Sequence, residues 1–225
     1  MEKTRHRQSQ APQMEGAMAR WYARQRGSAP QVAAVRRQAT QLTGGLPDGA
    51  AVLEVAPGPG YLAVEMARLG FAVTGLDMSR TFVEIATEKA RRTGVHADFL
   101  WGDAADLPLD ADSFELVVCQ AAFKNFGRPV GALDQMHRVL RTGGTAVIHD
   151  MNRDASRADI DREIKGMGLS GPNSLVTRMA LTALRRRAYS GAGFERLAAE
   201  SAFRTCDVHT DGILLEVRLT KRDGA

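Results

Sequence analysis

The chain of 225 residues has two cysteines and lacks any apolar run that approaches the length of a membrane span. Cys119 and Cys206 are far apart and form neither a CxxC pair nor the cysteine framework of a small secreted domain. A transmembrane helix needs about 20 mostly apolar residues, and residues 1–13 are polar and basic, unlike the apolar centre of a secretory signal. We therefore expect a soluble, cytoplasmic protein with no membrane span.

The chain also lacks a concentration of charge of one sign. It has 30 lysines and arginines and 26 aspartates and glutamates, which give a formal net charge of +4, and the basic residues are spread over both halves. The one run is Arg185-Arg186-Arg187, and arginines at a helix end more often offset the helix dipole than bind phosphate. Nucleic acid is therefore not an expected partner. Hydrophobic (44%) and charged (25%) residues occur in ordinary proportions, which indicates a globular protein.

The region before residue 50 is predicted to be helical. The first helix is amphipathic, because apolar residues recur at positions i, i+4, i+7 and i+8, namely Met14, Met18, Trp21 and Tyr22. We expect this face to lie over an apolar surface. A second helix is predicted near residues 32–42. We expect residues 1–13 to form a disordered tail and residues 14–45 to form lid helices whose order depends on a ligand.

From residue 50 the pattern alternates between strands and helices. Strands are predicted at residues 51–56, 72–77, 97–101, 114–119 and 145–149, and helices at 62–69, 80–93 and 129–141, the last stopped by Gly143-Gly144. This alternation predicts an α/β fold with a Rossmann-like, doubly wound and mostly parallel sheet. The final strands, 205–208 and 214–220, are too close in sequence for a parallel crossover, so the last strand is predicted to run antiparallel.

Residues 156–189 are inserted between the fifth strand and the last helix and are predicted to be helical. Ile160, Ile164 and Met167 fall on one face of this segment. Its larger apolar residues suit either the wall of a substrate pocket or an ordinary core, and the sequence leaves both open: Met167, Leu169, Leu175, Met179 and Leu184. We expect residues 14–225 to form one domain in which residues 156–189 are a helical cover over the acceptor site.

The most informative stretch is Glu54-Val55-Ala56-Pro57-Gly58-Pro59-Gly60-Tyr61, where the first strand hands over to the first helix of the sheet. Gly58 and Gly60 allow a ligand to approach the backbone, and the helix start presents free N–H groups to a carboxylate or phosphate. A tight turn without a ligand is the alternative. The stretch also matches the GxGxxA form of the dinucleotide fingerprint, with Asp77 at the end of the second strand. Asp77 would accept hydrogen bonds from ribose hydroxyls in either case, so a nicotinamide-dependent oxidoreductase stays open here.

Three further features favour another cofactor. Glu54 lies inside the first strand, where a nicotinamide enzyme usually has an apolar residue, and a buried carboxylate needs partners. Gly102-Asp103-Ala104 follows the third strand and offers a second acid and a backbone N–H for an adenine edge. The third feature is the predicted antiparallel last strand.

These motifs resemble the class I S-adenosylmethionine-dependent methyltransferases of the ubiquinone and menaquinone biosynthesis type, over about residues 14–221. The family's glycine motif is matched by Glu54-x-Ala56-x-Gly58-x-Gly60, its ribose acid by Asp77 and its adenine acid by Asp103. Two longer stretches also match, Phe114-Glu115-Leu116-Val117 and Met136-His137-Arg138-Val139-Leu140-Arg141-x-Gly143-Gly144. Ala56 replaces the usual first glycine, which matters little if the backbone there is ordinary.

The resemblance implies S-adenosyl-L-methionine as cofactor, S-adenosyl-L-homocysteine as product and in-line methyl transfer. It implies that Met78 packs on the adenine, that the Ala104 N–H meets the base and that Gln120 borders the methionine moiety. Tyr22 would be a lid residue near the cofactor carboxylate. Core packing is the alternative for Tyr22 and Met78.

The sequence does not identify a catalytic residue as clearly as it identifies the cofactor site. Alignment alone supplies about 7–11 kcal/mol to such a displacement. If the acceptor loses a proton, the candidate bases at strand ends are His149, Asp150 and Lys124, and His149 is our weak candidate. Lys124 and Asn125 are alternatively residues that bound the acceptor pocket.

The class of methyl acceptor is inferred from a motif that the sequence lacks. The Asn-Pro-Pro-Tyr or Asp-Pro-Pro-Tyr sequence of nucleic-acid amino methyltransferases does not follow the fourth strand, where Cys119-Gln120-Ala121-Ala122 stands. We therefore expect a small-molecule acceptor and no metal site. A non-catalytic protein that binds S-adenosylmethionine is the other alternative, and the sequence does not determine the oligomeric state.

Overall fold

The computed structural model describes residues 14–168 and 171–222, in which seven strands form one sheet of order β3-β2-β1-β4-β5-β7-β6. Strands β1 to β5 are parallel to their neighbours, and β7 runs antiparallel to both β5 and β6. The predicted fold class and the antiparallel last strand are confirmed. The strands are β1 (Ala51–Val55), β2 (Ala72–Asp77), β3 (Ala97–Trp101), β4 (Phe114–Gln120), β5 (Leu140–Met151), β6 (Asp207–Asp211) and β7 (Leu214–Thr220).

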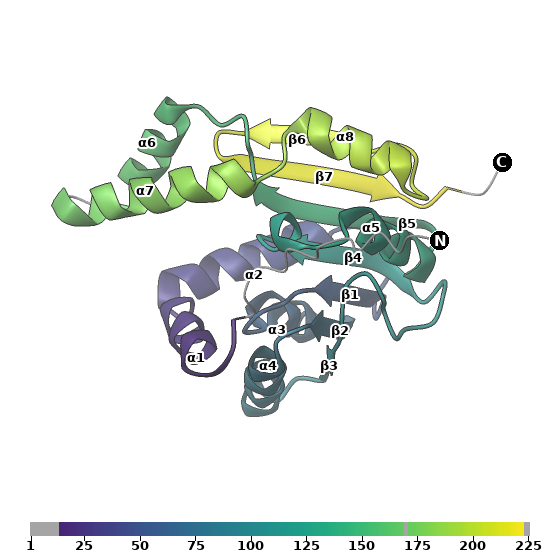
Figure 1. Ribbon diagram of the computed structural model, residues 1–225. Coiled ribbons are helices and arrows are strands. Elements are labelled where there is room, and N and C mark those ends of the chain that lie inside the picture. Colours follow the sequence, from purple (N-terminus) through teal and green to yellow (C-terminus); the bar gives the residue numbers. More distant parts are fainter. Residues whose placement is uncertain (1–13, 169–170, 223–225) are drawn as a thin grey trace, which may run out of the picture.

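Helices cover both faces of the sheet (Figure 1). Because side chains alternate along a strand, Val52 packs against α2 and α3 while Leu53 joins the core under α5 and α8. The helices are α1 (Gly16–Gln25), α2 (Ala29–Thr43), α3 (Tyr61–Arg68), α4 (Arg80–Thr93), α5 (Pro129–Val139), α6 (Arg157–Gly166), α7 (Gly171–Arg187) and α8 (Gly191–Glu200), with a short 3₁₀ turn η1 (Phe123–Asn125). None of these described helices is both long enough and apolar enough to cross a bilayer.

The predicted stop at Gly143-Gly144 is wrong. Helix α5 ends at Val139 and β5 begins at once, so the two glycines lie inside the strand. Gly143 and Gly144 pair there with Lys221 through the Gly143 N–H and the Gly144 carbonyl. A side chain at Gly144 would come within 2.8 Å of the Arg141 carbonyl, so the glycine permits a close backbone approach. The predicted strand 205–208 is likewise shifted, because β6 covers Asp207–Asp211.

The predicted apolar face of α1 is also wrong. Met18 and Trp21 are 60% and 52% exposed and Met14 is 37% exposed, whereas Ala19 and Ala23 are buried. Small alanines allow α1 to approach α4 closely, and the Tyr22 ring packs edge-on against Phe82 at 6.0 Å between centroids.

The segment predicted to be helical, residues 156–189, contains two helices, α6 and α7. Ile160 and Ile164 are buried as predicted, but Met167 is 47% exposed. No residue of α7 is buried, so its apolar side chains do not form an ordinary core. Leu169 and the proposed tail at residues 1–13 lie outside the described residues.

The close packing of Gly60 on α4, at the start of α3, leads to a testable prediction. Its φ is +72°, and an added Cβ would lie 2.6 Å from the Ala86 Cβ. Gly49 has the same φ of +72° with no atom within 4 Å of such a Cβ. We expect Gly60→Ala to lower the free energy of unfolding by about 2–4 kcal/mol, from strain and overpacking together, and Gly49→Ala by about 1 kcal/mol from strain alone. Equal losses in urea unfolding would show that the contact with α4 is not tight.

Candidate cofactor site

The candidate site lies at the carboxyl ends of β1, β2 and β4, where the order of the parallel strands reverses. In open α/β sheets this switch point leaves a crevice in which ligands bind. Two hollows occur there, on either side of Ala56, which lines both. The small hollow has about 70 Å³ and the large hollow about 260 Å³.

The turn between β1 and α3 has an unusual backbone. Gly58 and Gly60 have φ of +53° and +72°, as the glycines of a ligand-binding turn require. Ala56 has φ of +57°, so the backbone at this position is not ordinary and the replacement of the usual glycine does matter. Ala121, at the end of β4, has φ of +53° and also lines the large hollow. Each such alanine costs about 1 kcal/mol or more, and strain of this kind gathers at functional sites.

Asp77 closes this turn from the end of β2. Its carboxylate accepts hydrogen bonds from the Gly58 N–H at 2.9 Å and the Ser79 N–H at 2.8 Å, and the residue is 7% exposed. Burial raises the pKa of the Asp77 carboxyl, although both hydrogen bonds act to lower it. Asp77 therefore shapes the glycine turn whether or not it also meets a ribose.

The small hollow brings together the residues predicted around the adenine. Met78, Asp103 and Ala104 line it, with Phe126 and Ala132. Asp103 accepts hydrogen bonds from the Ala105 N–H and the Arg128 guanidinium, both at 2.9 Å. Its carboxylate is therefore held by two donors at the rim of the hollow.

The large hollow lies between the glycine turn and the N-terminal helices. Glu54, Gly58 and Gln120 line it from the sheet side, and Tyr22 lines it from α1. Sequence reasoning missed three further lining residues, Arg26, Gln38 and Tyr61. Only Tyr61 carries a sequence signal, because it follows Gly60 directly; the other two reach the site through the packing of α1 and α2.

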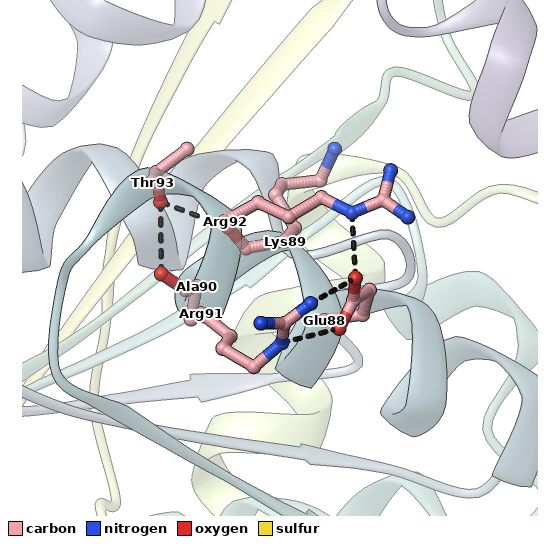
Figure 2. A network of polar contacts seen from close by, with 6 residues as sticks. All are labelled: Glu88, Lys89, Ala90, Arg91, Arg92 and Thr93. Atoms are coloured by element: carbon pink, nitrogen blue, oxygen red, sulfur yellow. Dashed lines mark hydrogen bonds and ion pairs between the residues drawn. The ribbon is translucent and has the colours of Figure 1, made fainter.

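Tyr61 connects three helices at the edge of the large hollow. Its hydroxyl donates to the Ala23 carbonyl of α1 at 3.0 Å, and the Lys89 ammonium of α4 lies 3.5 Å from the ring centroid. Figure 2 shows Lys89 extending away from its neighbour Glu88, which pairs instead with Arg91 and Arg92. Lys89 is thus left to stack on Tyr61. Burial raises the pKa of Tyr61, and the nearby Arg26 charge lowers it.

Two polar side chains at the large hollow have buried atoms without partners. Glu54 Oε2 and Gln120 Nε2 make no hydrogen bond within the part of the chain that the structure describes. Glu54 is 3% exposed, and burial raises its pKa to about 8, with a smaller upward effect of the Asp77 charge. An unpaired buried polar atom costs about 1–3 kcal/mol, so these two atoms point to a polar ligand.

His149 does not line either hollow. Its Nε2 lies 2.7 Å from Glu216 Oε2 and its Nδ1 lies 2.9 Å from Gln38 Nε2. Because the carboxylate only accepts, Nε2 carries the proton and Nδ1 accepts from the Gln38 amide. His149 therefore connects β7 to a residue of the large hollow.

The other candidate bases pair with each other. The Lys124 ammonium lies 2.7 Å from Asp150 Oδ1, and both side chains are buried. Lys124 also donates to the carbonyl of Ala121, so the pair supports the strained backbone at the end of β4. Of the residues around η1, Asn125 lines the small hollow. The described residues contain no group of three or more His, Cys, Asp or Glu side chains that could hold a metal ion.

Comparison with known proteins gives a family match at this site. The methyltransferase domain family matches residues 53–148, which include the end of β1, the glycine turn, β2, β3 and β4. The chain is 32% identical over 108 residues to a ubiquinone biosynthesis O-methyltransferase of Xanthomonas axonopodis, covering 48% of this chain and 45% of that protein. It is 38% identical over 98 residues to a demethylmenaquinone methyltransferase of Chlorobaculum tepidum, covering 43% and 39%. The matches thus span less than half the length of these relatives.

Similarity to solved structures extends over nearly the whole chain. A protein of Methanococcus maripaludis assigned as an S-adenosyl-L-methionine-dependent methyltransferase superposes with a TM-score of 0.74 at 17% identity, covering 96% of this chain and 97% of that one. At this identity the likeness establishes the fold. The chain therefore carries a methyltransferase-family domain at residues 53–148, set in the fold of the class I S-adenosylmethionine-dependent methyltransferases.

Proposed function

We propose that this chain transfers a methyl group from S-adenosyl-L-methionine to a small-molecule acceptor. The observation that carries the proposal is the pair of hollows on either side of Ala56, because the large one exposes unpartnered polar atoms of Glu54 and Gln120. A flat apolar base and a charged amino-acid moiety need these two different environments. When bound, the cofactor supplies a methyl group that its sulfonium already activates.

In this proposal the small hollow holds the base. Met78 packs on the ring, the Ala104 N–H meets its edge, and Asp103 marks the polar rim. Asp77 accepts hydrogen bonds from the ribose with the lone pairs that Gly58 and Ser79 leave free.

The large hollow then holds the amino-acid moiety. Glu54 and Gln120 provide an acceptor and a donor, and Tyr22 and Arg26 stand where a carboxylate needs donors. Gly58 leaves room for the ligand beside the turn, whereas Gly60 permits the close packing of α3 against α4.

We propose that α1 and α2 are a lid over the large hollow and that α6 and α7 cover the acceptor side. The lid is anchored at one end, because the Glu15 carboxylate accepts hydrogen bonds from the Arg80 and Thr81 N–H groups at the start of α4. Ala39 and Leu42 bury the second half of α2 in the core beside β1, so opening would involve the end of α1 and the start of α2. The family match favours methyl transfer over the nicotinamide-dependent alternative.

We further propose that His149 is a positioning residue rather than the base. Glu216 fixes its tautomer, and its Nδ1 holds the Gln38 amide against the large hollow. Deprotonation of the acceptor then depends on the acceptor's own acidity and on alignment.

The cofactor assignment predicts a selective gain in thermal stability. S-adenosylhomocysteine at 100 times its Kd should stabilise the folded protein by about 2.7 kcal/mol, which raises the Tm by about 5–10 °C in a chain of this size. NADH should leave the Tm unchanged. Gly58→Leu is the protein control, because an added Cβ meets no atom within 4 Å and the larger side chain would occupy the ligand space. Its φ of +53° strains a leucine and lowers the Tm of the free variant, so the ligand-induced shift is compared and not the Tm itself. A shift with NADH and none with S-adenosylhomocysteine would contradict the assignment.

The raised pKa of Glu54 predicts that the protein releases a proton when the cofactor binds. With a pKa of about 8 in the free protein, against an ordinary 4.5, the carboxyl is neutral at pH 6.5. A cationic ligand beside it lowers that pKa, so binding at pH 6.5 should release up to about one proton. Calorimetry in buffers of different ionisation enthalpy measures this number, and Glu54→Gln should remove it.

The same pKa fixes the direction of the pH dependence of stability. The unfolded chain loses the Glu54 proton above pH 4.5 while the folded protein keeps it to about pH 8, so the free protein loses stability as pH rises through this window. In the calorimetric experiment, release of the same number of protons by the parent protein and by Glu54→Gln would show that the cofactor charge does not lie beside Glu54.

The positioning role of His149 predicts coupling to Gln38. We expect His149→Gln and Gln38→Ala each to weaken S-adenosylhomocysteine binding about five- to tenfold, and the double variant to be no weaker than either one, which is a coupling energy of about 1 kcal/mol. His209→Gln is the control, since His209 also faces Glu216 across the sheet but is exposed. Additive losses would mean that the two side chains act independently.

A further inference from the structure

Helix α7 packs with its polar side inward. An unbroken stripe of exposed apolar side chains runs along its outer side at spacings of three and four residues: Leu175, Val176, Met179, Ala180, Ala183 and Leu184. Val176 and Met179 are each 66% exposed. A surface helix normally buries such a stripe, so the outer side of α7 is the reverse of the usual arrangement.

The inner side of α7 is held by polar contacts. Arg178 pairs with Asp161 of α6 at 3.2 Å, and Arg185 donates to the Ala155 carbonyl at 2.6 Å. Rotating the helix to bury the apolar stripe would break both contacts. The exposed stripe is thus a property of how α6 and α7 pack together.

Helix α1, like α7, exposes its large apolar side chains. It packs through Ala19 and Ala23, which leaves Met18 and Trp21 at 60% and 52% exposure. In Figure 1, α1 and α7 both lie toward the side to which β1 points, α1 below α2 and α7 above it. The two helices with exposed apolar side chains therefore lie at the same end of the sheet.

The charge of these helices indicates what covers them. Helix α1 contains Arg20 and Arg24, and α7 ends in the exposed Arg186 and Arg187, besides the inward-facing Arg178 and Arg185. Neither helix contains an aspartate or glutamate. A symmetric contact with a second copy would bring cationic faces together, which is unfavourable. Exposed Trp and Met side chains flanked by arginines suit the interface of an anionic bilayer, where apolar groups enter the headgroup boundary and cations meet lipid phosphates.

We propose that the exposed faces of α1 and α7 dock on an anionic lipid surface, so that this end of the sheet faces the membrane. The docking is reversible, because the apolar stripes are short and the attraction depends on charge. It does not depend on which acceptor the site takes.

Co-sedimentation with phosphatidylcholine vesicles, with and without about a third phosphatidylglycerol, tests the proposal. The full chain should bind the anionic vesicles and leave the neutral ones largely unbound, and raising the salt should weaken the binding. Val176→Glu with Met179→Glu should reduce binding at least about tenfold, because two carboxylates enter the apolar stripe. Leu69→Glu is the matched control, since Leu69 is also exposed (49%) but lies where α3 ends, just before the start of β2.

Trp21 provides a second readout that does not rely on the charged variant. In a Trp101→Phe background it is the one remaining tryptophan, and its emission should move to shorter wavelength with anionic vesicles. Failure to bind either vesicle, or equal losses in the α7 variant and Leu69→Glu, would overturn the proposal. A change in molar mass by light scattering that the α7 variant abolishes, without vesicle binding, would assign the face to a second copy instead.

Discussion

The hydrogen bond between the Asp77 carboxylate and the Gly58 N–H joins the end of β2 to the turn after β1, and the shape of the site depends on it. That bond holds the turn with Ala56, Gly58 and Gly60 all at positive φ. Ala56 in this conformation is the shared wall of the two hollows. A carboxylate at this position therefore has a structural purpose before any ligand arrives, and burial raises its pKa because the fold places it beneath the turn.

The second constraint is the unsatisfied polarity of the large hollow. Glu54 sits within β1, hydrogen-bonded in register between β2 and β4, so the protein cannot move it to solvent. The free protein avoids a buried charge by keeping the carboxyl neutral, as its pKa of about 8 indicates. Gln120 faces the same space with an unused amide N–H. A fold that leaves both atoms unpaired at one hollow gives up stability there, as ligand sites commonly do.

The sheet was predictable because its signals are local. Apolar runs of strand length, helices between them and glycines at the turns specify alternation, and the short link before β7 requires an antiparallel last strand. Strand ends can likewise be counted along the chain, which is why Asp103 and Gln120 line the hollows and Asp77 holds the glycine turn as candidates read from the sequence. Residues 53–148, which the family match covers, are the part where these signals are densest.

The failures share a physical cause, which is packing between segments far apart in sequence. The large side chains of α1 suggested the buried face, but the small Ala19 and Ala23 pack closer to α4. The pairing of Gly143 and Gly144 with Lys221 turned an expected helix stop into a strand. Gln38 reaches the site through the packing of α2, where His149 and Glu216 hold its side chain, and those contacts have no sequence signature.

The measurement that tests the central claim most directly is a crystal structure of the protein with S-adenosylhomocysteine. The account predicts the adenine in the small hollow between Met78 and Ala104, and the homocysteine moiety beside Glu54 and Gln120 with both of their unpaired atoms hydrogen-bonded. Electron density for the ligand outside these two hollows, or a complex in which Glu54 and Gln120 keep their unpaired atoms, would contradict it.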